Sequence, residues 1–217
     1  MGDKTAIHDK LTDMSAAEVV RSPDQENFWN GLETDGAAFA LYRDGELVVD
    51  IWGGYADFDS LKKWEKDTMG MWFSTTKAVI ALCIALLVDR KLMDYDDLVI
   101  KHWPEFGSNG KINITVQMIL SHKAGLAALD EEVTLEIARD WKALSKILEK
   151  QKPYSPPGQR RIYHAFTFGW LMDQIVRRVD PQHRGIGRFF SEEIAKPHGK
   201  SEFSGFVVIG LKECNLK

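Results

Sequence analysis

The sequence predicts an α+β fold, with strands near the start of the chain followed by a long helical stretch. Two patterns carry this prediction. Alternating apolar residues on both sides of an Asp-Gly pair indicate a β-hairpin in residues 37–52. A run of apolar residues over positions 74–90 indicates a helix that is buried on nearly every side. Because two strands do not form a stable sheet by themselves, the hairpin is expected to need further strands or a packing surface.

The composition is typical of a soluble globular protein and excludes several classes. Of 217 residues, 44% are hydrophobic and 28% are charged, and the formal net charge of −4 lacks the basic excess of nucleic-acid-binding proteins. Cys83 and Cys214 form no C-x-x-C motif, so we expect two free thiols, no metal site and no cofactor. Residues 78–88 are too short an apolar run to span a bilayer, and residues 1–20 lack a secretory signal. These features predict an intracellular, cytoplasmic protein.

The hairpin consists of strands at residues 37–43 and 46–52, joined by Asp44 and Gly45. An Asp-Gly pair suits this turn because both central residues require positive φ. Gly53 and Gly54 are expected to end the second strand.

The remaining segments are predicted from their apolar periodicity and from turn residues. Thr115 or Asn113 is expected to cap the third helix. One domain is expected at residues 22–199, after a loose segment at 1–21 and before a divergent tail at 200–217. The predicted helices are residues 23–32, 74–90, 115–121, 134–150, 166–179 and 191–195; the predicted loops are 61–68, 92–99 and 152–158; residues 206–211 resemble a strand.

Ser74 and Lys77 form the first candidate catalytic pair. In the first turn of a helix, side chains three residues apart lie on the same face. A serine hydroxyl becomes a nucleophile when a neighbouring base takes its proton, and a lysine shielded from water can be that base. The alternative is that Ser74 only caps the helix and that the amine of Lys77 reaches solvent. Lys77 is the only charged residue between Asp67 and Asp89, which favours a functional role.

Tyr163 is the second candidate, since a tyrosine beside a lysine can be held as a phenolate and move protons. It follows the Pro157-Gly158 loop and precedes the helix predicted at residues 166–179. The alternative is a half-buried aromatic side chain with no chemical role.

The motifs around these residues resemble the class C β-lactamase-related serine hydrolases, above all the family VIII carboxylesterases and the β-lactamase domain-containing proteins of animals. The resemblance extends over residues 23–199. It rests on Trp52–Ala56 (WGGYA), Phe73–Lys77 (FSTTK), Trp103–Phe106 (WPEF), Leu120–Leu126 (LSHKAGL), Pro157-Gly158, Tyr163–Ala165 (YHA) and Gly169-Trp170.

The resemblance implies a β-lactamase/transpeptidase-like fold, with Ser74 as the acylated nucleophile and Lys77 as its base. Tyr163 matches the tyrosine of the family's Tyr-x-Asn motif, but Ala165 replaces the asparagine. Loss of that amide favours esters over β-lactams as substrates. Ala165 and His164 are the implied substrate-binding positions. His122 lies in a segment that the resemblance marks as structural, and no catalytic role is assigned to it.

Family members are longer and carry a third motif, Lys-Thr-Gly or His-x-Gly, on a late strand. Residues 201–217 contain no such motif, so the resemblance implies a truncated chain without the C-terminal strands. Residues 78–88 would then expose apolar surface and favour self-association. Two hypotheses follow: a serine hydrolase acting on small esters or amides and impaired by the loss of the third motif, or a catalytically inactive isoform that acts by protein interaction.

Overall fold

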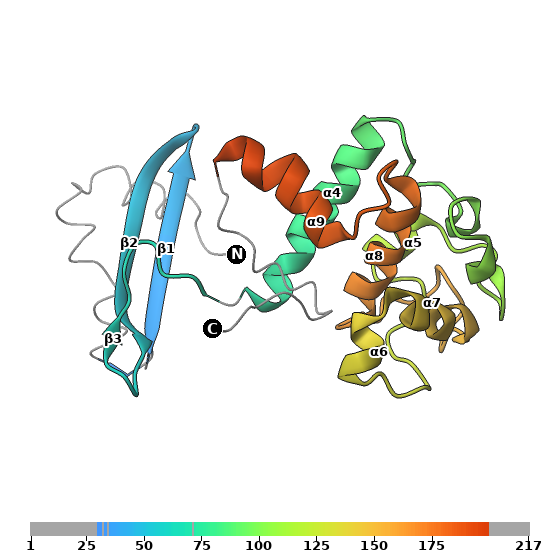
Figure 1. The fold of residues 1–217 in the computed structure, drawn as a ribbon, viewed down its shortest axis with the longest axis horizontal. Helices are drawn as coiled ribbons and strands as arrows, with labels where there is room; N and C mark the ends of the chain where they lie inside the picture. The colour runs from blue at the N-terminus through green and yellow to red at the C-terminus, as the bar shows by residue number, and fades with distance from the viewer. Residues whose placement is uncertain (1–29, 32, 34, 71, 200–217) are drawn as a thin grey trace, which may run out of the picture. The chain divides into compact units, whose positions relative to one another are not determined.

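The computed structural model describes residues 30–31, 33, 35–70 and 72–199 (Figure 1). The chain divides between residues 71 and 72 into two compact units, one with the strands and one with the helices. The described residues of both units lie within the domain predicted at 22–199, whose limits stay a prediction. The predicted strand at 206–211, most of the predicted helix at 23–32, and Cys214 lie outside the described residues.

The strand unit is an antiparallel sheet in the order β1-β2-β3. Its strands are β1 (Gly36–Arg43), β2 (Glu46–Asp57) and the short β3 (Lys62–Lys63). The turn between β1 and β2 is confirmed, since Asp44 and Gly45 have φ values of 52° and 84°. The left-handed conformation at both positions is the one that the Asp-Gly pair predicts.

The prediction that the glycine pair ends the second strand is wrong, because β2 continues to Asp57. Gly54 pairs with Gly36 across the sheet and adopts a φ of 79° within the strand. A side chain at Gly36 would place its Cβ 2.5 Å from the ring of Trp64, so this glycine permits close packing. The segment predicted as a loop at 61–68 also contributes β3.

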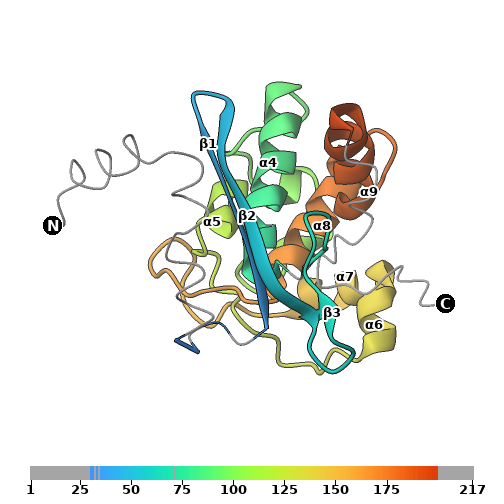
Figure 2. The ribbon, with the colours of Figure 1, turned by 90° about the vertical axis from the view of Figure 1, so that its left-hand side faces the viewer.

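The helical unit contains six α-helices among the described residues, and α8 contacts α4, α5, α7 and α9 (Figures 1 and 2). The predicted helix at 166–179 is confirmed as α8, apart from its first residue, and helix 74–90 corresponds to a 3₁₀ turn followed by α4. The helices are α4 (Thr76–Asp89), α5 (Val116–Leu120), α6 (Leu135–Arg139), α7 (Trp141–Lys150), α8 (Thr167–Val179) and α9 (Ile186–Phe190).

Within the helical unit, helix α4 is buried on one side only, so this unit alone does not provide the burial on nearly every side that the sequence predicts. Ile84 and Leu87 are fully buried in the helical core, whereas Leu82 is 52% exposed. Cys83 is buried as a free thiol, and burial raises its pKa to about 12. A thiol with so high a pKa is a poor nucleophile, which makes Cys83 a packing residue.

Local capping explains where two of the helices begin. Of the two predicted caps, Asn113 and Thr115, it is Thr115 that caps α5, by accepting the backbone N–H of Met118 at 3.2 Å. The single helix predicted at 134–150 is wrong, because Asp140 adopts an extended ψ of 96° and separates α6 from α7. Its carboxylate accepts two backbone N–H groups at the start of α7, so the acid serves as an N-cap.

The last helical segment begins earlier than the predicted residue 191. The backbone N–H of Ile186 donates to the Asp173 carboxylate at 2.8 Å, which fixes the start of α9. The helix then continues through a π turn at Ser191–Ala195 and a 3₁₀ turn at Lys196–His198. Gly199 follows this turn in the left-handed conformation, with a φ of 68°, and so caps its C-terminal end.

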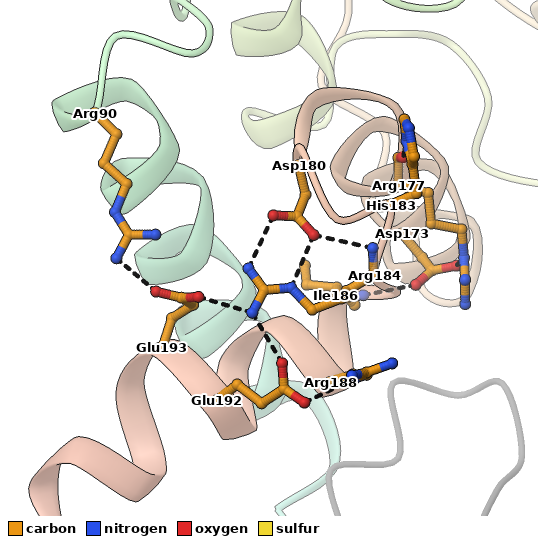
Figure 3. Close-up of polar contacts among 10 residues, drawn as sticks. All are labelled: Arg90, Asp173, Arg177, Asp180, His183, Arg184, Ile186, Arg188, Glu192 and Glu193. Carbon is orange, nitrogen blue, oxygen red and sulfur yellow. Dashed lines mark hydrogen bonds and ion pairs between the residues drawn. The ribbon is translucent and has the colours of Figure 1, made fainter.

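A buried charge network joins the ends of α4 and α8 to the π turn (Figure 3). The guanidinium of Arg184 donates to both carboxylate oxygens of Asp180, at 2.8 and 2.9 Å, and to Glu192 at 2.9 Å. Glu193 pairs with Arg184 at 2.7 Å and with Arg90, next to the end of α4, at 2.6 Å. Hydrogen bonds from Arg184 hold the pKa of Asp180 below its usual value. Both members of the central pair are almost fully buried, so each compensates the other's charge.

Candidate active site

Ser74 lies in a 3₁₀ turn, Phe73–Thr75, that leads directly into α4. Its side chain is exposed. The preceding residue, Phe73, has a φ of 40°, in the left-handed region that disfavours residues with a Cβ. Strained backbone of this kind is concentrated at functional sites, where the surrounding structure holds it in place.

Lys77 lies in the first turn of α4 and faces Ser74, as their spacing predicts. Its Nζ is 3.3 Å from Ser74 Oγ and donates to the backbone carbonyl of Ala165 at 2.9 Å. The ammonium group also lies 4.8 Å from the ring centroid of Tyr163 and 5.8 Å from that of Phe168. Two aromatic rings and a carbonyl therefore fix the amine beside the hydroxyl.

Tyr163 completes the cluster from a segment 89 residues further along the chain. Its Oη is 2.6 Å from Ser74 Oγ. Hydrogen bonds with Lys77 and Ser74 lower the pKa of Tyr163 from its usual value of 10.0. The structure thus brings together all three side chains that the sequence singled out, and it makes the phenolate easier to form.

The two positions predicted to bind substrate occupy different environments. His164 is fully buried; its Nε2 accepts the backbone N–H of Leu126 at 3.1 Å, and its Nδ1 lies 2.6 Å from the carbonyl of Ile162. Both ring nitrogens therefore hold backbone segments, and burial lowers the pKa of His164. Ala165 contributes its carbonyl to Lys77. A contact of either residue with substrate stays a prediction.

Sequence reasoning missed two parts of this environment. The carbonyl of Ala165 has no sequence signal, because every residue carries one. Phe168 fits the apolar pattern of α8 and is indistinguishable from a core residue until its ring is placed near Lys77. Residues 183–185 have the sequence pattern of the His-x-Gly motif, but they lie in the turn before α9 and not on a strand.

Within residues 30–31, 33, 35–70 and 72–199, no group of three or more His, Cys, Asp or Glu side chains is placed to hold a metal ion. In the same part of the chain, no helix has both the length and the apolar character needed to cross a membrane.

A Ser-Lys-Tyr cluster at the start of a core helix, in an α+β fold, defines a β-lactamase/transpeptidase-like protein. The β-lactamase family model matches residues 25–209, and the chain belongs to this family. Esterase/β-lactamase LipL of Mycobacterium tuberculosis is 37% identical over 170 residues, which cover 77% of this chain and 38% of LipL.

Solved structures show the same fold. A family VIII carboxylesterase is 38% identical, with a TM-score of 0.80, and the match covers 87% of this chain and 51% of the carboxylesterase. A penicillin-binding protein homologue from Caulobacter crescentus is 41% identical, with a TM-score of 0.79, covering 86% of this chain and 49% of the homologue. The chain therefore spans about half the length of these structures.

Proposed function

We propose that this chain supplies the nucleophile of an ester hydrolase, with Ser74 as the acylated residue. The observation that carries the proposal is the position of Ser74 Oγ, which lies 3.3 Å from the amine of Lys77 and 2.6 Å from the hydroxyl of Tyr163. A nucleophile, a group that can take its proton and a cation that stabilises the resulting charge are therefore in direct contact.

In the proposed reaction, Ser74 Oγ attacks the ester carbonyl carbon while its proton passes to the phenolate of Tyr163. Tyr163 thus takes the role of base that the resemblance assigns to Lys77, and the ammonium group of Lys77 stabilises the phenolate. The first backbone N–H groups of a helix have no intrahelical acceptor, and in this proposal the N–H of Ser74 stabilises the oxyanion. The carbon–oxygen bond to the leaving alcohol then breaks, and Tyr163 returns the proton to the alcohol. Water hydrolyses the acyl-serine by the same proton transfers in reverse.

The proposed substrates are small esters in preference to β-lactams. Ala165 offers a methyl group where the family's Tyr-x-Asn motif has an amide that can hydrogen-bond the acyl amide of a penicillin. The names of two relatives, a family VIII carboxylesterase and the esterase/β-lactamase LipL, support an ester as the substrate.

The test is labelling with a fluorophosphonate probe, followed by mass spectrometry and by assays with p-nitrophenyl acetate and a chromogenic cephalosporin. We expect Ser74 to be labelled, Ser74→Ala to abolish labelling and ester turnover, and the exposed control Ser60→Ala to change neither. Labelling that persists in Ser74→Ala refutes the nucleophile. Faster turnover of the cephalosporin than of the ester refutes the substrate class.

A second candidate function is binding without turnover, as an inactive isoform that acts by protein interaction. It is favoured by the openness of the site, since the side chain of Tyr163 is 51% exposed and Ser74 is exposed as well. Electrostatic stabilisation of a transition state is weaker where water has access. The match covers only 51% of the carboxylesterase, so the rest of that fold is available to enclose the corresponding site there.

The two candidates are separated by joining the C-terminal half of the carboxylesterase to this chain. If loss of the third motif impairs the site, the fusion should raise ester turnover by about 10²–10³-fold, which is the usual contribution of one oxyanion donor. The Ser74→Ala fusion is the matched control. Ester turnover by the chain alone, unchanged in the fusion, rejects the second candidate.

A further inference from the structure

His122 occupies a backbone position at which glycine or asparagine is usual. It follows α5 and has a φ of 61°. The N–H of His122 donates to the carbonyl of Ile119 at 3.0 Å, and the next N–H, that of Lys123, donates to the carbonyl of Met118 at 2.6 Å. This pair of bonds is the Schellman motif, whose left-handed residue is disfavoured when it carries a Cβ. A histidine in this strained position therefore points to a role for its side chain.

The side chain and carbonyl of His122 hold the backbone on both sides of Tyr163. Ile162, immediately before Tyr163, donates its N–H to the carbonyl of His122 at 2.9 Å. His164, immediately after it, donates its N–H to His122 Nδ1 at 3.2 Å. One residue thus supplies both acceptors that bracket Tyr163.

The imidazole ring also packs against the aromatic groups of the candidate site. Its centroid lies 4.9 Å from that of Tyr163, 5.5 Å from that of His164 and 5.2 Å from that of Phe168. Tyr163 and Phe168 are the two rings that face the ammonium group of Lys77. The ring of His122 therefore supports the same aromatic wall that positions the amine.

Hydrogen bonding through Nδ1 requires this atom to be unprotonated, so the proton of the neutral ring lies on Nε2. The titratable and charged groups that act on the ring are Lys77, Arg161, His164 and Tyr163. Burial first, and then the charges of His164, Lys77 and Arg161, hold the pKa of His122 below 6.5. Protonation would remove the acceptor for His164 N–H and place a second cation near Lys77.

We propose that His122 is a positioning residue that fixes Tyr163 against Ser74 and Lys77 and that must be uncharged to do so. The kinetic consequence rests on the proposed hydrolase function. The structural consequence, the position and ionisation of the Tyr163 phenol, does not depend on turnover.

The experiment compares His122→Gly with His122→Asn. Glycine suits the left-handed backbone but removes the side-chain acceptor, so we expect a retained melting temperature and a kcat lower by about 10²-fold, as for a misplaced catalytic group. Asparagine tolerates the same backbone, and its amide oxygen can replace Nδ1, so it should retain most of the wild-type kcat. His183→Gly is the matched control, because His183 has a similar φ of 52° in the turn before α9.

Two readouts separate positioning from a purely structural role. As the pH falls below 6.5 and through the lowered pKa of His122, the wild type should lose activity beyond what the asparagine variant loses. Tyrosine labelled with ¹³C at Cζ, assigned with Tyr163→Phe, should titrate closer to its usual pKa in His122→Gly than in the wild type.

Wild-type kcat and an unchanged Tyr163 titration in His122→Gly would overturn the proposal, as would an unaltered acidic loss in His122→Asn. If the wild type shows no Ser74-dependent hydrolysis, the proposed function fails. The Tyr163 titration then still decides whether His122 positions the phenol.

Discussion

The two units differ sharply in how many of their large apolar side chains are buried. In the helical unit, large residues such as Trp103, Phe106 and Phe189 are fully buried. Among the described residues of the strand unit, only Val49 has a buried apolar side chain, whereas Phe39 and Trp52 are 52% and 43% exposed. The helical unit has a core of its own, and the strand unit is held mainly by the hydrogen bonds of its hairpin.

The difference shows that the two units are held together by different interactions. Asp44-Gly45 and the alternating strands define the hairpin locally, but three strands with a single buried apolar side chain among their described residues contribute little free energy of folding. Tertiary burial and satisfied polar groups stabilise the helical unit, which also carries all three candidate catalytic side chains. Substitutions that disturb this unit should therefore be the most harmful to stability.

The largest expected effect is at the buried pair of Arg184 and Asp180. Arg184→Met leaves the almost fully buried carboxylate of Asp180 without its partner. We expect a loss of about 3 kcal/mol in the free energy of unfolding, since removing one member of a buried pair leaves an uncompensated charge. For a chain of this size, the melting temperature should fall by about 6–12 °C.

Thermal and urea unfolding, followed by circular dichroism at 222 nm, measure this change. Arg188→Met is the matched control, because the Arg188 side chain is 68% exposed although it pairs with Glu192 at 2.7 Å. An Arg184→Met protein as stable as the control would contradict the assignment of stability to this network.

A smaller loss is expected at Lys111, which is fully buried and donates to three carbonyls. Its Nζ lies 2.9 Å from Ser108 O, 2.7 Å from Glu149 O and 2.6 Å from Gln151 O, and so caps the end of α7. Lys111→Met should cost about 2 kcal/mol in the free energy of unfolding, because these carbonyls lose their donor. The exposed Lys152→Met is the control, and equal urea midpoints for the two variants would contradict this role.

Local chemistry allowed much of this fold to be predicted. Asp44-Gly45 predicted the turn and Thr115 the cap of α5, because both signals act within a few residues. The spacing of Ser74 and Lys77 predicted their contact, because a helical turn fixes it. The resemblance to a family, and not periodicity, connected Tyr163 with them across the intervening sequence.

Other features depend on tertiary structure and could not be read from local patterns. Asp140 separates two helices by capping the second, although the apolar pattern continues through it. The acceptor of Lys77 is a backbone carbonyl, which no side-chain pattern reveals. His122 carried a readable signal, since a histidine directly after a helix occupies a position typical of glycine, but its contacts with Ile162 and His164 required the fold.

The smallest effect on stability, and the largest on association, is expected from the exposed apolar residues of the hairpin. Phe39 and Trp52 lie on opposite faces of the sheet, since Phe39 pairs with Ile51 and Trp52 is the next residue. The double variant Phe39→Thr/Trp52→Thr retains β propensity, so the free energy of unfolding should change by only about 0.5 kcal/mol.

We expect the double variant to bind less 1-anilinonaphthalene-8-sulfonate and to self-associate less in sedimentation velocity runs. Leu82→Gln, on the exposed side of α4, is the comparison variant, because the sequence predicts self-association through residues 78–88. Loss of dye binding and self-association in Leu82→Gln, with none in the double variant, would place the associating surface on the helical unit and reverse the comparison.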